Sequence, residues 1–171
     1  MKEMKAFLDI LDSISEFTGK GVSWIVLVIT IMMGYEVLVR YVFNAPTQWA
    51  YDMSYMLGGT FFFIGASYTL RMKGHVRIDI FYNRFSPRTK ALIDVIFSLI
   101  FFFPLWVGLL YNLIPYVYLS WSISEKSLES YWRPPIYPFK TVMPIGVFLL
   151  LLQGTAEFIR SLSALIKEKS V

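Results

Sequence analysis

Three charged residues near the ends of two apolar stretches are the best candidates for chemistry in this sequence. Glu36 and Arg40 lie toward the end of the first stretch, and Asp52 lies at the start of the second. Such a cluster could gate a pathway for an ion or solute through a membrane. We favour the alternative of a salt-bridge cluster that fixes helix packing, because Glu36 precedes Arg40 by one helical turn in the stabilising order. A charge at the membrane edge also costs less than one at the centre.

Other residue types needed for catalysis or metal binding are scarce. His75 is the only histidine and cysteine is absent, which excludes a metal site built on histidines or thiolates. Lys73 and Arg77 flank His75 and disfavour its protonation, so we expect it to hydrogen-bond within its loop rather than transfer protons. We find no nucleophile–base pair, glycine-rich phosphate loop or paired-carboxylate site. We therefore expect no enzyme activity, no catalytic residue, no metal and no cofactor.

Four long apolar stretches must position these residues. The chain has 171 residues, of which 56% are hydrophobic, and the central thirds of the stretches carry no ionisable side chain. Each stretch meets or exceeds the ~20 residues that cross a hydrocarbon layer of ~30 Å as a helix. The stretches lack the alternation of barrel strands. The sequence therefore predicts an all-α integral membrane protein with a single membrane domain, 1–171. The predicted spans cover about 20–43, 48–71, 88–122 and 138–162.

The distribution of basic residues predicts the topology. Twelve of the 16 lysine and arginine residues lie before the first span, in the second loop or after the last span. The excess of basic residues on one side predicts that both termini and the second loop are cytoplasmic. The net charge of +4 thus reflects membrane topology, and we expect no nucleic-acid partner.

Two further helices are predicted outside the spans. Residues 5–18 carry apolar side chains at three- and four-residue intervals, which indicates an amphipathic helix at the membrane surface or against a partner. The acidic residues of this segment favour a protein contact. In the second loop, helical spacing predicts a short interfacial helix with Asp79 as its N-cap. The apolar residues of the first segment are Phe7, Leu8, Leu11, Ile14 and Phe17.

The third predicted span is longer than a bilayer requires. Ser86 as the N-cap and Pro87 at the first helical position predict where it begins. A straight helix over the apolar residues that follow would rise ~45 Å. It must tilt, protrude, or bend at Pro104 or Pro115. We favour protrusion on the outer side, where aromatic residues gather. In the fourth span, Glu157 is spaced to pair with Arg160.

A stripe of small residues runs along the second span. Ser54 and Gly58 are four residues apart, and Gly65 and Thr69 repeat that spacing. Small residues at this spacing allow another helix to approach closely in lipid. Glycine is also simply common in membrane helices, but the length of the stripe favours packing.

Several short motifs, taken in order, resemble the small membrane subunit of TRAP (tripartite ATP-independent periplasmic) transporters. The resemblance covers about residues 20–160, and its most specific part is the His-Val-x-x-Asp element after the second span. The motifs are Arg40-Tyr41-Val42-Phe43-Asn44, Trp49 with Asp52, Gly65-Ala66, Gly74-His75-Val76-Arg77-Ile78-Asp79, Glu125-Lys126-Ser127 and Pro144-Ile145-Gly146.

The resemblance implies a bacterial inner-membrane, multi-pass subunit that works with a large membrane subunit and a periplasmic substrate-binding protein. It implies sodium-driven uptake of an organic acid, commonly a carboxylate, with the substrate and sodium sites in the large subunit. The small subunit would brace the large one, help to dock the binding protein and contact membrane lipids. The candidate interface residues are Ser54, Gly58, Gly65, Thr69, Glu36, Arg40, Asp52, His75, Asp79, Glu125, Glu129 and Arg133.

Two other functional classes stay open. A self-contained small tetraspan carrier would need a carboxylate deep in a helix, whereas Glu36 lies near the end of its span. A membrane enzyme, or an assembly or scaffold subunit of another complex, is the second alternative. The enzyme should show a polar catalytic cluster, and the sequence contains none.

Overall fold

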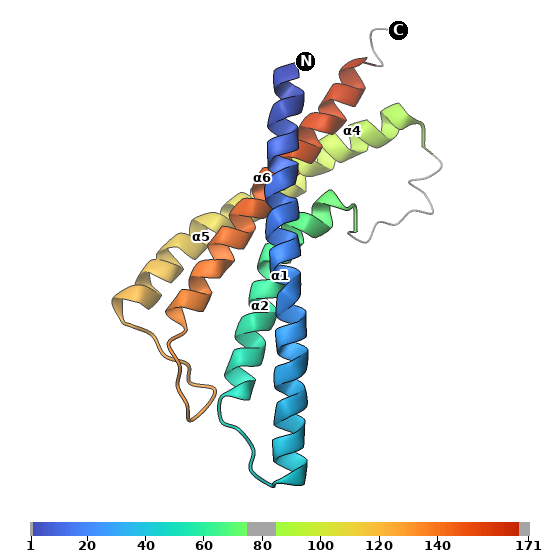
Figure 1. The fold of residues 1–171 in the computed structure, drawn as a ribbon. Helices are drawn as coiled ribbons and strands as arrows, with labels where there is room; N and C mark the ends of the chain where they lie inside the picture. Colours follow the sequence, from blue (N-terminus) through green and yellow to red (C-terminus); the bar gives the residue numbers. More distant parts are fainter. Residues whose placement is uncertain (1, 75–84, 168–171) are drawn as a thin grey trace.

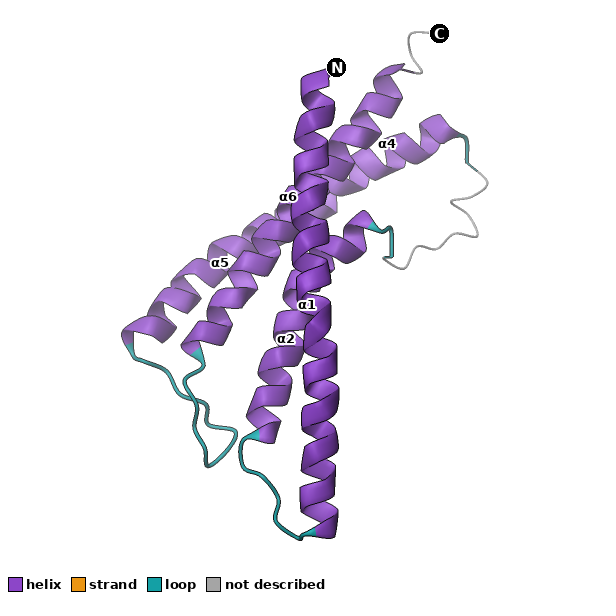
Figure 2. Cartoon of the chain, in the orientation of Figure 1, coloured by secondary structure: helices purple, strands orange, loops and turns teal. Residues whose placement is uncertain are grey.

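The computed structural model describes residues 2–74 and 85–167, which form helices joined by loops (Figures 1 and 2). No strand occurs among these residues, and Lys126 and Pro135 form an isolated β-bridge. Figure 1 shows α1 and α2 as one pair and α5 and α6 as another; the pairs diverge toward the loops that follow α1 and α5. The elements are α1 (Lys2–Val42), α2 (Ala50–Arg71), α4 (Pro87–Phe97), the π-helix η1 (Ser98–Phe102), α5 (Phe103–Ser122) and α6 (Tyr137–Lys167).

Three helices are long and apolar enough to cross a membrane. They are α1, the continuous helix from α4 through α5, and α6. The second predicted span, 48–71, is the 22-residue helix α2, which is not among these three. Polar residues along α2, including Asp52, Ser67 and Arg71, lower its hydropathy. The all-helical class is therefore confirmed, while a membrane span at 48–71 stays a prediction.

The amphipathic segment 5–18 is not a separate helix. It forms the first part of α1, a single helix of 41 residues. One side of the segment is covered by α6, because Leu8 and Leu11 are buried in a cluster with Ala156. Burial of leucine side chains against a neighbouring helix favours a continuous α1 over a bend that would lay the segment on a surface. The structure therefore shows no break between this segment and the rest of α1, and where the membrane span begins within α1 stays a prediction.

The third span is continuous but irregular where proline interrupts its hydrogen bonding. Ser86 caps it as predicted, since its Oγ accepts a hydrogen bond from the backbone N–H of Thr89 at 3.3 Å, and Pro87 opens α4. The π-helix η1 lies directly before Pro104. Proline cannot donate a backbone hydrogen bond and its ring clashes with the preceding turn, and a π-turn relieves this conflict. Helix α5 continues through Pro115.

Helix α6 is the centre of the bundle and contacts α1, α2, α4 and α5. At Gly146 it approaches α2 so closely that an added Cβ atom would lie 2.6 Å from the backbone oxygen of Phe63. The largest fully buried side chain is that of Gln153, while many large apolar side chains elsewhere point away from the chain. This small, polar interior and apolar exterior are typical of helices that pack within lipid.

Candidate functional site

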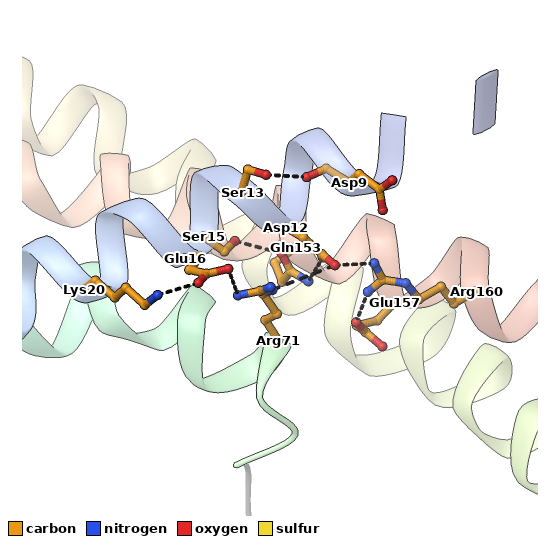
Figure 3. A network of polar contacts seen from close by, with 10 residues as sticks. All are labelled: Asp9, Asp12, Ser13, Ser15, Glu16, Lys20, Arg71, Gln153, Glu157 and Arg160. Atoms are coloured by element: carbon orange, nitrogen blue, oxygen red, sulfur yellow. Dashed lines mark hydrogen bonds and ion pairs between the residues drawn. The ribbon is translucent and has the colours of Figure 1, made fainter. Parts of the chain in front are cut away.

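An ionic and hydrogen-bonded network joins α1, α2 and α6 (Figure 3). Asp12 is at its centre. Its Oδ2 atom accepts from Nη2 of Arg160 at 2.6 Å, and its Oδ1 atom accepts from Nε2 of Gln153 at 3.0 Å. Nε of Arg71, the last residue of α2, lies 3.8 Å from the same Oδ2 atom. One carboxylate of α1 therefore contacts both other helices.

Further contacts extend this network along α1. Ser15 Oγ donates a hydrogen bond to the side-chain oxygen Oε1 of Gln153 at 2.7 Å. Glu16 forms ion pairs with Arg71 at 2.8 Å and with Lys20 at 2.5 Å. The predicted Glu157–Arg160 pair is confirmed. Sequence reasoning missed the rest, although a glutamine inside the apolar run of α6 is a signal for a buried polar contact. We call the following eight residues the inner network: Asp12, Ser15, Glu16, Lys20, Arg71, Gln153, Glu157 and Arg160.

The predicted cluster of Glu36, Arg40 and Asp52 is divided between two sites. Glu36 and Arg40 pair as predicted, with Nη2 of Arg40 2.5 Å from Oε1 of Glu36. The other carboxylate oxygen of Glu36 accepts from the backbone N–H of Thr47 at 3.1 Å and from its hydroxyl. Asp52 takes no part in this pair. Glu36 therefore fixes the loop after α1, and the expectation of one three-residue cluster was wrong.

Asp52 instead organises the loop between α5 and α6. Its carboxylate is fully buried and accepts hydrogen bonds from Ser127 Oγ at 2.7 Å and from Ser130 Oγ. The same two hydroxyl oxygens accept from the backbone N–H groups of Glu129 and Trp132, each at 3.2 Å. Since the serines are themselves buried or half-buried, this carboxylate determines the path of the loop backbone.

An ion pair and a hydrogen bond to Glu125 also hold the beginning of this loop. Nζ of Lys140, which is 7% exposed, lies 2.5 Å from Oε2 of Glu125 and 4.2 Å from the ring centroid of Tyr116. Ser120 donates to the same Glu125 oxygen at 2.6 Å. The hydrogen bonds from Lys140 and then Ser120 hold the pKa of the Glu125 carboxyl below its usual range. By contrast, the predicted interface residues Glu129 and Arg133 are exposed.

A shallow groove of about 370 Å³ lies between this loop and the start of α2. Beside it the side chains of Leu128 and Tyr131 are 82% and 93% exposed. Exposed apolar side chains on a loop held by buried polar contacts suit binding to another protein. The groove is lined by Tyr51, Tyr55, Glu125, Lys126, Ser127, Leu128, Glu129 and Ile136.

The small-residue stripe lies mostly on the side of α2 that other helices leave open. An added Cβ at Gly58 would meet no atom within 4 Å, whereas one at Gly65 would lie 3.9 Å from Cγ1 of Val22 on α1. Ser54 is half-buried and Thr69 is exposed. Contact with α6 is made by the opposite side of α2, where Asp52 and Ser67 are buried. Within this chain, the stripe is therefore not the main packing face.

Two predicted residues, His75 and Asp79, and the interfacial helix predicted around Asp79 lie outside the described residues. Among the residues that the structure does describe, no group of three or more histidine, cysteine or acidic side chains could hold a metal ion. In the same residues, every buried side-chain nitrogen and oxygen has a hydrogen-bond partner. The polar groups thus serve to hold helices and loops together.

A comparison with protein families agrees with these features. The family model described as "Tripartite ATP-independent periplasmic transporters, DctQ component" matches residues 29–164, most of the helical bundle. No individual curated protein matches the sequence. Because the match covers well over half of the chain, the protein belongs to the DctQ family, the small membrane component of TRAP transporters.

Proposed function

We propose that this chain is the non-catalytic small permease subunit of a sodium-driven TRAP transporter that takes up an organic acid, a carboxylate in particular, across a bacterial inner membrane. Its proposed partners are a large membrane subunit and a periplasmic substrate-binding protein. The observation that carries the proposal is the match to the DctQ component over residues 29–164. The contacts of the described polar residues, which link helices and loops of this chain, support a bracing role.

The proposed topology has four spans, with both termini in the cytoplasm. Helix α2 supplies the additional span, since its 22 residues rise ~33 Å as an α-helix and reach across a hydrocarbon layer. Its contacts with both α1 and α6 support its place within the bundle. The first residues of α1 and the last turns of α6 lie at the same end of the molecule, as an even number of spans requires (Figure 1).

We assign the contact with the large subunit to the open face of α2. Gly58 has no neighbour within 4 Å of its added Cβ, and Ser54 and Thr69 lie on the same side of the helix. Two helices can approach closely along such a face and gain van der Waals contacts in lipid. Glu36 and Arg40 at the outer end, and His75 and Asp79 after α2, remain candidate interface residues.

We assign docking of the binding protein to the loop 123–136. The two buried anchors at Asp52 and Lys140 hold the loop in place, and its exposed residues include Glu129, Tyr131 and Arg133. A preorganised loop binds with less loss of conformational entropy than a mobile one.

Reconstitution into proteoliposomes tests the function directly. The large subunit together with this chain and the binding protein should take up a labelled carboxylate when an inward sodium gradient is imposed. This chain alone should show none above empty liposomes. Uptake by the isolated chain would establish a self-contained carrier instead, and failure to co-purify with the large subunit would reject the bracing role.

A further inference from the structure

We propose that the inner network is a latch that holds residues 2–18 against α6, and that α1 bends at Gly21 when the latch opens. The inference goes beyond the proposed function and does not rest on it. It concerns a conformational element within this chain, and its test needs no other subunit.

The geometry of Asp12 makes it the central contact of the latch. Its two oxygens bind different residues of α6, with Nη2 of Arg160 at 2.6 Å and Nε2 of Gln153 at 3.0 Å. Gln153 is fully buried and also accepts from Ser15, one turn farther along α1. Amide and carboxylate hydrogen bonds are directional, so together they set both the distance and the register between α1 and α6.

The charges of the inner network balance only while Asp12 is ionised. Its acids are Asp12, Glu16 and Glu157, and its bases are Lys20, Arg71 and Arg160. The side chain of Asp12 is 21% exposed, and those of Arg71 and Arg160 are 24% and 34% exposed. Partial exclusion of water strengthens these pairs relative to fully exposed ones. Neutralising Asp12 therefore leaves two guanidinium groups without their shared carboxylate.

Apolar packing holds the segment on one side only. Leu8 and Leu11 are buried against α6, next to Ala156. Phe7 is 47% exposed, Ile10 is 59% exposed and Phe17 is 83% exposed, so the described residues leave a second apolar strip largely uncovered. The polar contacts of Asp12 add to this apolar contact and, unlike it, are directional.

The two glycines near the end of the latched segment, Gly19 and Gly21, have different surroundings. An added Cβ at Gly19 would lie 2.4 Å from the Tyr68 side chain, so close packing of α1 on α2 accounts for this glycine. Gly21 has nothing within 4 Å, and packing gives no reason for it. Glycine inside a helix costs about 1 kcal/mol relative to alanine. Gly21 therefore weakens α1 where the latched segment meets the rest of the helix.

Disulfide trapping in the full chain in lipid nanodiscs tests the latch. Ser163 Oγ lies 4.0 Å from Met4 Sδ, and the protein has no cysteine, so the Met4→Cys, Ser163→Cys pair reports contact between the start of α1 and the end of α6. Asp12→Asn should slow disulfide formation by at most about fivefold, because losing one or two membrane-protein hydrogen bonds shifts the closed–open equilibrium by that factor and the rate follows the closed fraction. The matched control is Asp9→Asn, an identical change at an exposed position of the same segment outside the inner network, which should have no effect.

Two further variants keep the test decisive. Gln153→Leu removes the buried hydrogen bonds without changing the charge, and it should also slow trapping. Gly21→Ala in the Asp12→Asn background should restore part of the rate, because alanine stiffens α1 at this position and meets no neighbour. Trapping at the wild-type rate in both Asp12→Asn and Gln153→Leu would overturn the latch, and no recovery with Gly21→Ala would overturn the bend at Gly21. Neither result would bear on transport by the assembled complex.

Discussion

Ser127 Oγ donates to Oδ1 of Asp52 at 2.7 Å, although the two residues are 75 positions apart in the chain. The contact joins the first turn of α2 to the loop between α5 and α6. Because Asp52 is fully buried and Ser130 binds its other oxygen, the order of that loop depends on a residue outside it.

Asp52→Ala should loosen the loop. The buried hydroxyls of Ser127 and Ser130 would lose their acceptor, at a cost of about 1–3 kcal/mol. We expect faster tryptic cleavage after Lys126 in nanodiscs, with the helices intact by circular dichroism. Glu129→Gln, an exposed change in the same loop, should cleave at the wild-type rate; equal cleavage of all three proteins would contradict the anchoring role of Asp52.

Comparing Gly58→Leu with Gly146→Leu should distinguish contact with the large subunit from packing within this chain. Gly146→Leu forces its side chain into the backbone of Phe63 and should lower the stability of the isolated chain by about 1–3 kcal/mol. An added Cβ at Gly58 meets no atom of the described residues within 4 Å, so the thermal stability of Gly58→Leu should stay close to wild type. If the open face of α2 binds the large subunit, Gly58→Leu should reduce co-purification several-fold. Unchanged co-purification would remove this face from the interface.

Gly65→Leu tests the same stripe less cleanly. We expect it too to weaken co-purification while leaving membrane insertion intact. Val22 of α1 lies 3.9 Å from the added Cβ, however, so a larger side chain there also presses on this chain. Comparing the thermal stability of the Gly65→Leu and Gly58→Leu proteins separates these two effects, because only the former should be destabilised.

The Glu125 carboxyl should make the loop between α5 and α6 sensitive to acid. Its pKa in the folded protein is lowered, chiefly by the hydrogen bond from Lys140. A lowered folded-state pKa gives stability that is fully present above the unfolded value of about 4.3 and is lost as pH falls through the folded value. The thermal midpoint of the wild type should therefore drop toward that of Glu125→Gln as pH is lowered below about 4.3. A constant gap between the two proteins from pH 7 to pH 3 would contradict this.

Replacing Glu125 alone should destabilise the protein more than replacing Glu125 and Lys140 together. It is 7% exposed and its ammonium group faces Glu125 and the Tyr116 ring. Glu125→Gln leaves the Lys140 ammonium group without its counterion, and the loss should be smaller than the about 3–5 kcal/mol of a fully buried pair because the Glu125 side chain is 30% exposed. The double variant Glu125→Gln, Lys140→Met should recover part of this loss in thermal unfolding. Additive losses would show that the two side chains do not depend on each other.

The sequence by itself determined the helical class, three helices able to span a membrane, the start of the third span at Ser86 and two local ion pairs. These features depend on residues close together in the chain: apolar run length, a cap three residues from its donor, and charges one helical turn apart. The motif order in residues 20–160 also indicated the family, which the match over 29–164 confirms.

Only the tertiary structure decided what Asp12, Asp52 and Gln153 do. Their partners lie on other helices or loops, and periodicity describes which face a residue occupies without saying which helix covers that face. The same reason explains why residues 5–18 looked like an independent amphipathic helix. Their leucines need an apolar neighbour, which a membrane surface or a helix can equally supply, and here the folded chain brings α6 to them.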